Sequence, residues 1–369
     1  MKFTCLQENL EKGLQIVSRA VPNKGSLPIL SNILFVAENG RLKLAATNLE
    51  TAVTTYVPCS VEEEGSVTIP AKLIKDFVST LRPGTIKASL NHDVLHITSE
   101  KTKSKFNGIS ADEYPELPVF PEDVSYFELD PKEFGDDVAY VAFASGNDES
   151  RPIFTGIFLN YQEGVLTIAS TDGFRLSEKI LKIESSVGNF SAVIPARTML
   201  EVSKIFAGSQ EKIKFALNEG ENLALFSSED TTVATRILDG QYPDYKKIIP
   251  SEKVLSASFS TDEFVEAVKL TNVFAKEGNN AIKVRFDPEE NLIRISSLAE
   301  EAGEHISELG AEIEGDLLEI AFSSRYLLDY LNNIKTERIH FRTNGNISPC
   351  LLLSDAHENF IHIIMPMQI

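Results

Sequence analysis

The sequence has few cysteines and no long apolar run. Its three cysteines, Cys5, Cys59 and Cys350, are odd in number and far apart, which excludes a disulfide framework and a CxxC zinc site. No stretch of about 18 apolar residues is present to span a bilayer. The opening residues, MKFTCLQENLEKG, lack the apolar core of a signal peptide. We therefore expect a cytoplasmic protein that does not contact a membrane.

Positive charge is also scarce. The chain has 35 Lys and Arg against 54 Asp and Glu, a net charge of −19. Taken alone, this argues against nucleic-acid binding, because a basic surface supplies most nonspecific affinity for DNA. Net charge does not say where the charges lie, however. A chain of 369 residues is long enough for two or three domains, so the distribution of charge within them matters more.

The motifs of common enzymes are absent as well. The histidines show no HExxH or similar ligand spacing, and no Walker A, GxGxxG or GxSxG motif occurs. Zinc-finger spacing and an RNP motif are missing too. We predict no metal and no cofactor. An enzymatic alternative would use Asp172 of the stretch STDGFRLS with Arg175 or a nearby histidine as an acid–base pair, and the absence of these motifs counts against it.

A threefold internal repeat is what the sequence does contain. The segments SVTIPAKLIKDF, SAVIPARTMLEV and LLEIAFSSRYLL place Ile69, Ile194 and Ile320 in register, at intervals of 125 and 126 residues. Three more sets recur in the same order: Leu44, Ile168 and Ile295; Ile86, Ile213 and Ile339; Ser99, Ser228 and Ser354. Four matches in one order and at nearly one spacing indicate three copies of one domain.

The repeat predicts three domains, at 1–120, 121–250 and 251–369. Their joints fall in polar, proline-containing stretches, YPELPVFPEDVSY and YPDYKKIIPSEKVLSA, which have the composition of exposed linkers. Each repeat has the pattern strand, helix, several strands, helix, several strands. We therefore expect an α+β fold in which each domain packs two helices on antiparallel sheets.

The expected helices have apolar stripes at helical spacing. In the first repeat these stripes are Leu10, Leu14 and Val17, then Leu73, Ile74, Phe77, Val78 and Leu81. Pro70 and Pro195 are expected in the first turns of the second helices. The first helices of repeats two and three are expected to begin near DPKEF and STDEF, each with a residue suited to capping.

The expected helices carry many of the scarce basic residues. These are Lys12, Arg19, Lys72, Lys75, Arg82, Lys132, Arg197, Lys204, Lys269, Lys276, Arg325 and Lys335. On a single helix such residues usually form a solvated polar face. Repetition in three domains favours a second interpretation, in which helices face inward around an arc and line it with positive charge. Such a lining would hold duplex DNA without reading its sequence.

Several motifs together resemble one family. The three-repeat plan, LPILSNILF, IPAKLIKDF, STDGFRLS, YPDYKKIIP and the terminal IIMPMQI closely resemble the bacterial sliding clamps, the beta subunits of DNA polymerase III, over the whole chain. The resemblance implies clamp domains assembling as a head-to-tail dimeric ring around duplex DNA. It also implies a non-catalytic processivity factor that tethers the replicative polymerase, the clamp loader and repair proteins through short linear motifs.

The resemblance implies that TDGFRL forms one wall of a peptide-binding pocket. Carried over by position, the pocket residues are Phe154, Thr171, Gly173, Phe174, Arg175, Leu176, Pro243, Lys247, Ile248, Tyr326, Met365, Pro366 and Met367. We expect an apolar cleft, with Arg175 meeting peptide carbonyls at its rim and Asp172 holding the turn. Alternatively, Leu176 and Ile248 are ordinary core. Phe174 and Lys247 stand where the family commonly has histidine and arginine, and Gln368-Ile369 where it has Arg-Leu, so we expect a different rim chemistry.

The resemblance also implies DNA-contacting and dimer-forming residues. The DNA candidates are Lys24, Lys72, Lys75, Arg151, Arg197 and Lys204. Phe106 is expected at the dimer interface, opposite Val273 and Phe274 of a second copy, although Phe106 and Phe274 could equally be core. A last alternative is a three-domain scaffold that never meets DNA, which the net charge of −19 would favour.

Overall fold

The computed structural model describes residues 1–22, 27–185, 187–218, 220–250, 253–277, 279–299, 303–357 and 359–368. Two compact units make up the chain. Unit 1 comprises Met1–Phe134, Ser185–Val187 and Glu201–Ile237, and unit 2 comprises Gly135–Glu184, Gly188–Leu200 and Leu238–Ile369. In the described part of the chain, no helix has the length and apolar character needed to cross a membrane.

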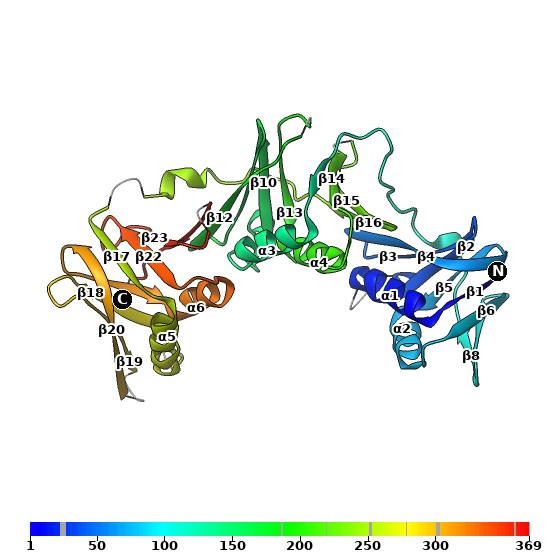
Figure 1. Ribbon diagram of the computed structural model, residues 1–369, viewed down its shortest axis with the longest axis horizontal. Helices are drawn as coiled ribbons and strands as arrows, with labels where there is room; N and C mark the ends of the chain where they lie inside the picture. The colour runs from blue at the N-terminus through cyan, green and yellow to red at the C-terminus, as the bar shows by residue number, and fades with distance from the viewer. Residues whose placement is uncertain are drawn as a thin grey trace. The chain divides into compact units, whose positions relative to one another are not determined.

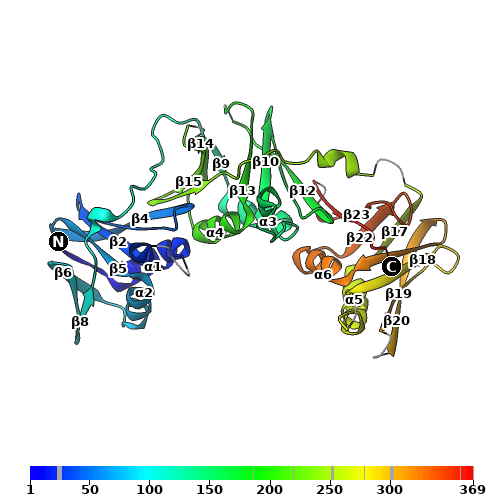
Figure 2. The same ribbon diagram turned by 180° about the vertical axis from the view of Figure 1, so that it is seen from behind.

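The described residues form six α-helices, two for each repeat, as predicted (Figure 1). They are α1 (Gln7–Val17), α2 (Ala71–Thr80), α3 (Pro131–Ala142), α4 (Ala196–Phe206), α5 (Thr261–Ala275) and α6 (Ser324–Asn333). Helix α1 packs beside α2 in unit 1, and α5 packs beside α6 in unit 2, as both views show (Figures 1 and 2).

Unit 1 contains a twelve-stranded antiparallel sheet. Its strands are β1 (Lys2–Leu6), β2 (Asn32–Glu38), β3 (Arg41–Thr47), β4 (Thr51–Glu63), β5 (Gly65–Pro70), β6 (Thr85–Asn91), β7 (Val94–Ser99), β8 (Thr102–Asn107), β9 (Phe127–Leu129), β14 (Ile213–Asn218), β15 (Leu223–Ser228) and β16 (Thr231–Arg236). The main path runs β8-β7-β6-β1-β4-β16-β15-β14-β9, so β8 is an edge strand.

Unit 2 contains a second twelve-stranded sheet, ordered β13-β10-β11-β12-β24-β23-β22-β17-β20-β19-β18-β21. Its strands are β10 (Gly156–Gln162), β11 (Val165–Thr171), β12 (Arg175–Lys182), β13 (Phe190–Pro195), β17 (Leu255–Ser260), β18 (Ala281–Asp287), β19 (Leu292–Ala299), β20 (Gly303–Gly315), β21 (Leu318–Ser323), β22 (Arg338–Thr343), β23 (Cys350–Ser354) and β24 (Phe360–Ile364). Each sheet thus takes four strands from the middle repeat. The two compact units correspond to the two sheets and not to the three repeats. The domain boundaries at 120 and 250 therefore stay a prediction.

The registers that defined the repeat are structurally equivalent. Ile69, Ile194 and Ile320 are all buried, and each lies on the strand that leads into the second helix of its repeat, β5, β13 or β21. The sets beginning with Leu44 and Ile86 are buried throughout as well. The repeat therefore reflects one hydrophobic pattern that builds the same core three times.

The helix stripes are confirmed in α1 and only partly in α2. Leu10, Leu14 and Val17 are fully buried, as are Ile74 and Val78. Leu73, however, is 56% exposed, so the prediction that it belongs to the core stripe was wrong. The apolar face of α2 that meets the sheet is narrower than its sequence suggests.

The helix starts agree with the capping prediction, with one correction. Asp130 Oδ1 accepts hydrogen bonds from the backbone N–H groups of Lys132 and Glu133, at 2.9 and 3.0 Å, where α3 begins. Ser260 caps α5 in the same way, through the N–H of Glu263. Pro70 and Pro195 do not lie in first helical turns: each ends the preceding strand, one residue before its helix.

One strand pairing recurs between successive repeats. In unit 1, β4 pairs with β16, with Thr51 opposite Thr235 and Thr55 opposite Thr231. In unit 2, β12 pairs with β24, with Arg175 opposite Ile364. In both, the fourth strand of one repeat meets the last strand of the next. We call these pairings the first and second junctions.

Candidate functional site

The stretch STDGFRLS forms a tight turn at the second junction, between β11 and β12. Thr171 Oγ1 donates to the carbonyl of Arg175 at 2.6 Å and accepts from the N–H of Gly173 at 3.0 Å. Asp172 Oδ1 accepts from the N–H groups of Phe174 and Arg175, at 2.9 and 3.0 Å. Gly173 has φ +94, in the left-handed region that glycine tolerates best. The prediction that Asp172 holds the turn is confirmed.

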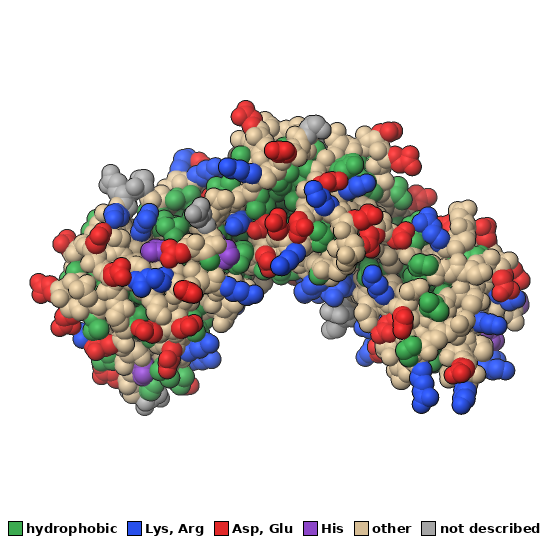
Figure 3. Space-filling view, viewed as in Figure 1, with side chains coloured by type: hydrophobic (Ala, Val, Ile, Leu, Met, Phe, Trp, Pro, Cys, Tyr) green, Lys and Arg blue, Asp and Glu red, His purple; other side chains and the backbone are tan. Residues whose placement is uncertain are grey.

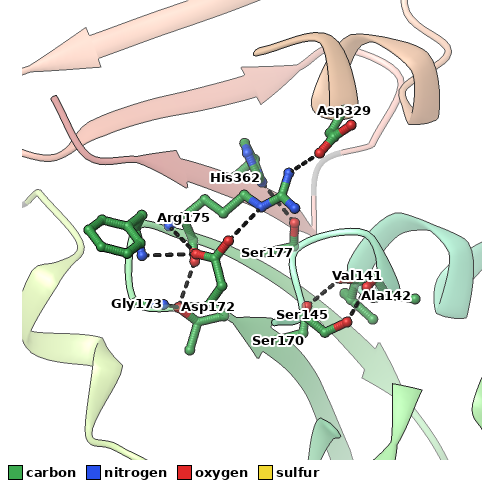
Figure 4. A network of polar contacts seen from close by, with 12 residues as sticks. Val141, Ala142, Ser145, Ser170, Asp172, Gly173, Arg175, Ser177, Asp329 and His362 are labelled. Carbon is green, nitrogen blue, oxygen red and sulfur yellow. Dashed lines mark hydrogen bonds and ion pairs between the residues drawn. The ribbon is translucent and has the colours of Figure 1, made fainter. Parts of the chain in front are cut away.

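The Arg175 side chain is not at the rim, which corrects the expectation. It is only 6% exposed, and its guanidinium binds Asp172 Oδ2 at 3.1 Å and Asp329 Oδ2 at 2.5 Å (Figure 4). It also lies 4.6 Å from the centre of the Tyr326 ring. Arg175 thus ties the turn to helix α6. Since two carboxylates already engage it, Arg175 supports the surrounding surface rather than offering donors to peptide carbonyls.

The side chains of β12 alternate between two environments. Ser177 points to the same side as Arg175, where its hydroxyl lies 2.8 Å from His362 Nδ1 (Figure 4). His362 is fully buried, and this burial, helped by the nearby charge of Arg175, holds its pKa well below the usual range. A neutral imidazole without solvent access cannot exchange protons with a substrate. The described residues also contain no cluster of His, Cys, Asp and Glu that could hold a metal ion.

The opposite side of β12 forms an apolar base. Leu176 is 1% exposed and belongs to a cluster with Tyr242, Tyr245 and Ile363. The Tyr242 ring stacks on Phe158, with centroids 4.7 Å apart. Leu176 is therefore a core residue, as the alternative interpretation of the sequence proposed. It lies beneath the surface and is not accessible from it.

More exposed side chains surround this base. Phe174 is 57% exposed and lies stacked against Tyr326, with ring centres 6.5 Å apart. The short 3-10 helix η5 (Tyr245–Ile248) follows Pro243 and presents Lys247 and Ile248 to solvent. Lys247 is paired with Asp244 at 2.9 Å. Phe174, Tyr326 and Ile248 can offer apolar contacts to a partner, and Lys247 lies at their margin.

The residues after β24 pass directly beside the turn. The N–H of Met365 donates to the carbonyl of Phe174 at 2.8 Å, and that of Met367 donates to Ala321, also at 2.8 Å. Met365, Pro366 and Met367 are all half-buried. These backbone bonds fix the tail next to Phe174. We call the docking surface the set of Phe174, Pro243, η5, Tyr326 and residues 365–367, with Leu176 buried beneath it.

The short 3-10 helix η4 (Pro152–Thr155), which carries Phe154, and the preceding Arg151 lie beside the turn. The Arg151 guanidinium lies 5.1 Å from the centre of the Phe154 ring, and a Cβ on Gly173 would lie 3.8 Å from its Nη1. Arg151 is also paired with Asp148 at 3.3 Å. The structure therefore places Arg151, predicted for DNA, beside the turn formed by STDGFRLS, which we call the docking turn. Its position three residues before Phe154 was the available signal.

Family models match nearly the whole chain. They are described as the DNA polymerase III beta subunit N-terminal domain at residues 1–118, its central domain at 128–244 and its C-terminal domain at 246–368. The beta sliding clamp of Synechococcus elongatus is 33% identical, with both chains fully covered, and that of Bacillus subtilis is 29% identical with the same coverage. The chain belongs to the DNA polymerase III beta subunit family.

Solved structures of the beta subunit family agree with this fold. The Thermotoga maritima DNA polymerase III beta subunit superimposes with a TM-score of 0.93 at 28% identity, covering 100% of this chain and 99% of the other. The Bacillus subtilis sliding clamp gives 0.94 at 28% identity with the same coverage. The expected fold class, three clamp domains of helices on antiparallel sheet, is therefore confirmed.

The DNA candidates suggested by the beta subunit family are scattered over the described residues. Lys24 lies outside them. Lys72 and Arg197 are exposed, Lys75 is half-buried, and Lys204 shares Glu201 with Arg19 at 3.0 and 2.6 Å. Acidic and basic side chains are mixed over the face in Figure 3. A basic lining formed by all three repeats stays a prediction.

The dimer candidates differ in accessibility. Phe106 is buried within unit 1, where its ring meets Phe77 edge-on at 5.0 Å. Val273, on α5, is 62% exposed, and Phe274 is half-buried and stacks on His305 at 5.4 Å. Phe106 therefore packs as core within its own chain, and Val273 is the member of the three that is open to a partner.

Sequence reasoning missed the supports of the docking surface. Three contacts between residues distant in sequence support it: Arg175 with Asp329, Tyr245 with Glu178, and Ser177 with His362. Glu178 gave one signal: a charged residue stands where the alternation of β12 calls for an apolar one, between Leu176 and Ile180. A charge in such a position needs a partner, although the pattern does not say which.

Proposed function

We propose that this chain is a DNA sliding clamp, a non-catalytic processivity factor of the cytoplasm. Two copies close head to tail around duplex DNA without reading its sequence. The docking surface binds short linear motifs of the replicative polymerase, the clamp loader and repair proteins. The observation that carries this proposal is the full-length match to proteins named beta sliding clamps, together with the docking turn in the middle repeat.

The recurring junction supports closure by a second copy. The fourth strand of repeats one and two meets the last strand of the following repeat. In the third repeat the fourth strand is β20, and within the described residues its first half pairs with β19 alone. Strand β8, the last of repeat one, is a sheet edge. Exposed edges of this kind invite pairing, so β20 of one copy would meet β8 of another.

The junction registers define how these strands would pair. Ser307 is equivalent to Thr55 in repeat one and to Lys179 in repeat two. The three residues lie opposite Ile295, Leu44 and Ile168, which are themselves in register. Applied to β20 and β8, the same rule sets Ser307 opposite Thr102 and Glu304 opposite Lys105. Exposed Lys103 and Lys105 thus face the strand that carries Glu304 and Glu308. Opposite charges across the ladder favour this pairing.

Helix α5 adds an apolar component to the proposed interface. Phe143 is the residue of the middle repeat that is equivalent to Val273. The centre of its ring lies 5.1 Å from that of His362, which belongs to the following repeat. Val273 and Ile306 are both exposed, as expected for surfaces awaiting an equivalent neighbour. Leu73 on α2 would supply apolar surface from the other copy. Phe106 and Phe274 would border this contact.

The DNA residues remain a proposal at the level of single side chains. Lys24, Lys72, Lys75, Arg151, Arg197 and Lys204 would each contribute one phosphate contact, and binding would weaken with salt and ignore base sequence.

Encirclement is tested by loading the protein on nicked circular DNA with a clamp loader and then linearising the circle. We expect retention on the circle and loss after cutting. Equal retention on both forms would overturn encirclement. Gel filtration should show a dimer of about twice 40.8 kDa, whereas a stable monomer would count against the ring.

The strand register is tested by introducing cysteines through Lys105→Cys and Glu304→Cys in one chain. Side chains directly opposite on antiparallel strands lie about 5 Å apart, so oxidation should join two copies by disulfides. Ser104→Cys with Glu304→Cys is the matched control, because these side chains point to opposite faces. Equal crosslinking of both pairs would contradict the register.

A further inference from the structure

We propose that Glu178 and Tyr245 are positioning residues of the docking surface: the hydrogen bond between them fixes η5 and so sets the affinity for the guest peptide. The inference rests on the proposed function, since it concerns the same surface. Neither residue was assigned a role by the sequence, and neither needs to touch the guest.

The pair is buried and specific. Tyr245 Oη donates to Glu178 Oε2, and each residue is only 6% exposed. Burial, reinforced by the neighbouring charge of Glu178, raises the pKa of the Tyr245 phenol, so it keeps its proton and remains a donor. A carboxylate in such a place is costly unless hydrogen-bonded, and replacement by apolar groups would often be neutral for stability. A role beyond stability therefore explains why it stands here.

The segment held by this bond has few other anchors. From Gly240 to Ile248, Tyr242 and Tyr245 are the buried residues, and the others are exposed. Tyr242 is held by stacking on Phe158, with an interplanar angle of 5°. Tyr245 begins η5, so its side chain sets where Lys247 and Ile248 lie. A stacked ring can slide along its neighbour, whereas a hydrogen bond has a preferred distance and angle. The bond from Tyr245 to Glu178 therefore fixes the position of the Tyr245 ring more closely than stacking fixes that of Tyr242.

The acceptor of this hydrogen bond, Glu178, lies on a strand that reaches the docking turn. Glu178 lies on β12 two residues after Leu176 and therefore on the same side of the sheet. Its backbone is opposite Ile361 on β24, the strand that leads into Met365. One carboxylate thus connects the strand that starts at the docking turn with the wall formed by η5.

The first junction lacks this pair. The positions equivalent to Glu178 and Tyr245 are Thr54 and Leu117, judged by the strand register and by the spacing from Tyr114 and Tyr242. Leu117 packs in an apolar cluster with Tyr114. The same architecture is therefore stable without an acid–phenol bond, which occurs where the docking surface is.

The test measures binding of a fluorescein-labelled QLSLF peptide to the full-length protein by fluorescence polarisation. Wild-type protein must bind first, since failure there would refute the proposed function and not this inference. Tyr245→Phe should then weaken binding about tenfold, the range of a hydrogen bond to a charged group. Glu178→Gln keeps an acceptor oxygen and should stay within about twofold of wild type.

Tyr161→Phe is the matched control, because it removes the hydroxyl of another buried tyrosine, one that donates to Ile183 away from the docking surface. It should leave peptide affinity unchanged. Glu178→Leu combined with Tyr245→Phe should weaken binding no more than Tyr245→Phe alone. Hydrogen exchange of residues 243–249 should accelerate in Tyr245→Phe and not in Tyr161→Phe. Unchanged affinity in Tyr245→Phe, or an equal loss in Tyr161→Phe, would overturn the proposal.

Discussion

The turns at the two junctions make the same hydrogen bonds, through a threonine in both and through Asn48 in one and Asp172 in the other. In unit 1, Thr47 Oγ1 donates to the carbonyl of Thr51 and accepts from the N–H of Leu49, and Asn48 Oδ1 accepts from Glu50 and Thr51. These bonds correspond one for one to those of Thr171 and Asp172 in the docking turn. The turn itself is therefore architecture shared by the first two repeats.

What differs is what each turn presents. At the position of Arg175, Thr51 makes a hydroxyl contact with Thr235 at 3.3 Å. Glu50 stands at the position of Phe174, and Leu49, with φ +74, at that of Gly173. The two turns thus share their hydrogen bonds and differ in the side chains at these three positions. Exchanging those side chains between the turns is the direct way to test this.

The largest effect is expected from Arg175→Ala. It leaves Asp172 and Asp329 without their shared cation, and removing one partner of a buried ion pair costs about 3 kcal/mol. The matched change in the other turn, Thr51→Ala, should cost about 1 kcal/mol. Urea unfolding measures both. Equal losses would mean that the ion pairs add nothing beyond the shared turn.

Removal of the residues from Met365 onward should weaken peptide binding about a hundredfold, because two partly buried methionine side chains at about 1.5 kcal/mol each are lost with the backbone bond to Phe174. The dimer should persist in gel filtration, since the proposed interface uses β8 and β20. Peptide affinity is read by fluorescence polarisation. Full affinity after truncation would remove the tail from the docking surface.

Phe174→Glu copies Glu50 into the docking turn. Phe174 is exposed, so stability should change by less than about 0.5 kcal/mol. Peptide affinity should fall about tenfold, because the aromatic surface beside Tyr326 is lost and a charge replaces it. The reverse change, Glu50→Phe, should create no peptide binding. Calorimetric titration distinguishes these outcomes, and a gain of binding in Glu50→Phe would show that one aromatic ring is sufficient.

The smallest effects concern the left-handed position. Gly173→Leu copies Leu49 and should destabilise the protein by about 1 kcal/mol, since a Cβ is disfavoured at this φ although space is available. Leu49→Gly should be stabilising or neutral, as the same strain is released. Thermal unfolding of the two variants gives the comparison. Destabilisation by Leu49→Gly would show that the Leu49 side chain makes contacts that outweigh the strain.

The sequence predicted the repeated core well, because the same apolar periodicity occurs three times. Ile69, Ile194 and Ile320 are equivalent in the structure as they are in register. Local patterns also located the helices, and they failed where tertiary packing decides: Leu73 satisfies the helical spacing of α2 but is exposed. Nothing within one element could indicate that the sheet leaves this position uncovered.

The docking surface was predictable in its turn and not in its supports. The residues of TDGFRL could be read as a turn, and the alternation of β12 places Arg175 and Leu176 on opposite sides. Besides the nearby Asp172, Arg175 binds Asp329, 154 positions away on another repeat, and no local rule connects Arg175 to Asp329. The expectation of Arg175 at the rim failed for this reason: its charge was already matched by a distant carboxylate.

The long sequence separation of the junctions has a consequence for synthesis on the ribosome. The first junction joins residues 184 positions apart, and the second joins residues 185 apart. Arg236, the last residue of β16, completes the first, whereas the second requires β24. A growing chain can therefore assemble unit 1 while the docking surface is still open. Nascent chains would have no completed surface with which to compete for partner proteins.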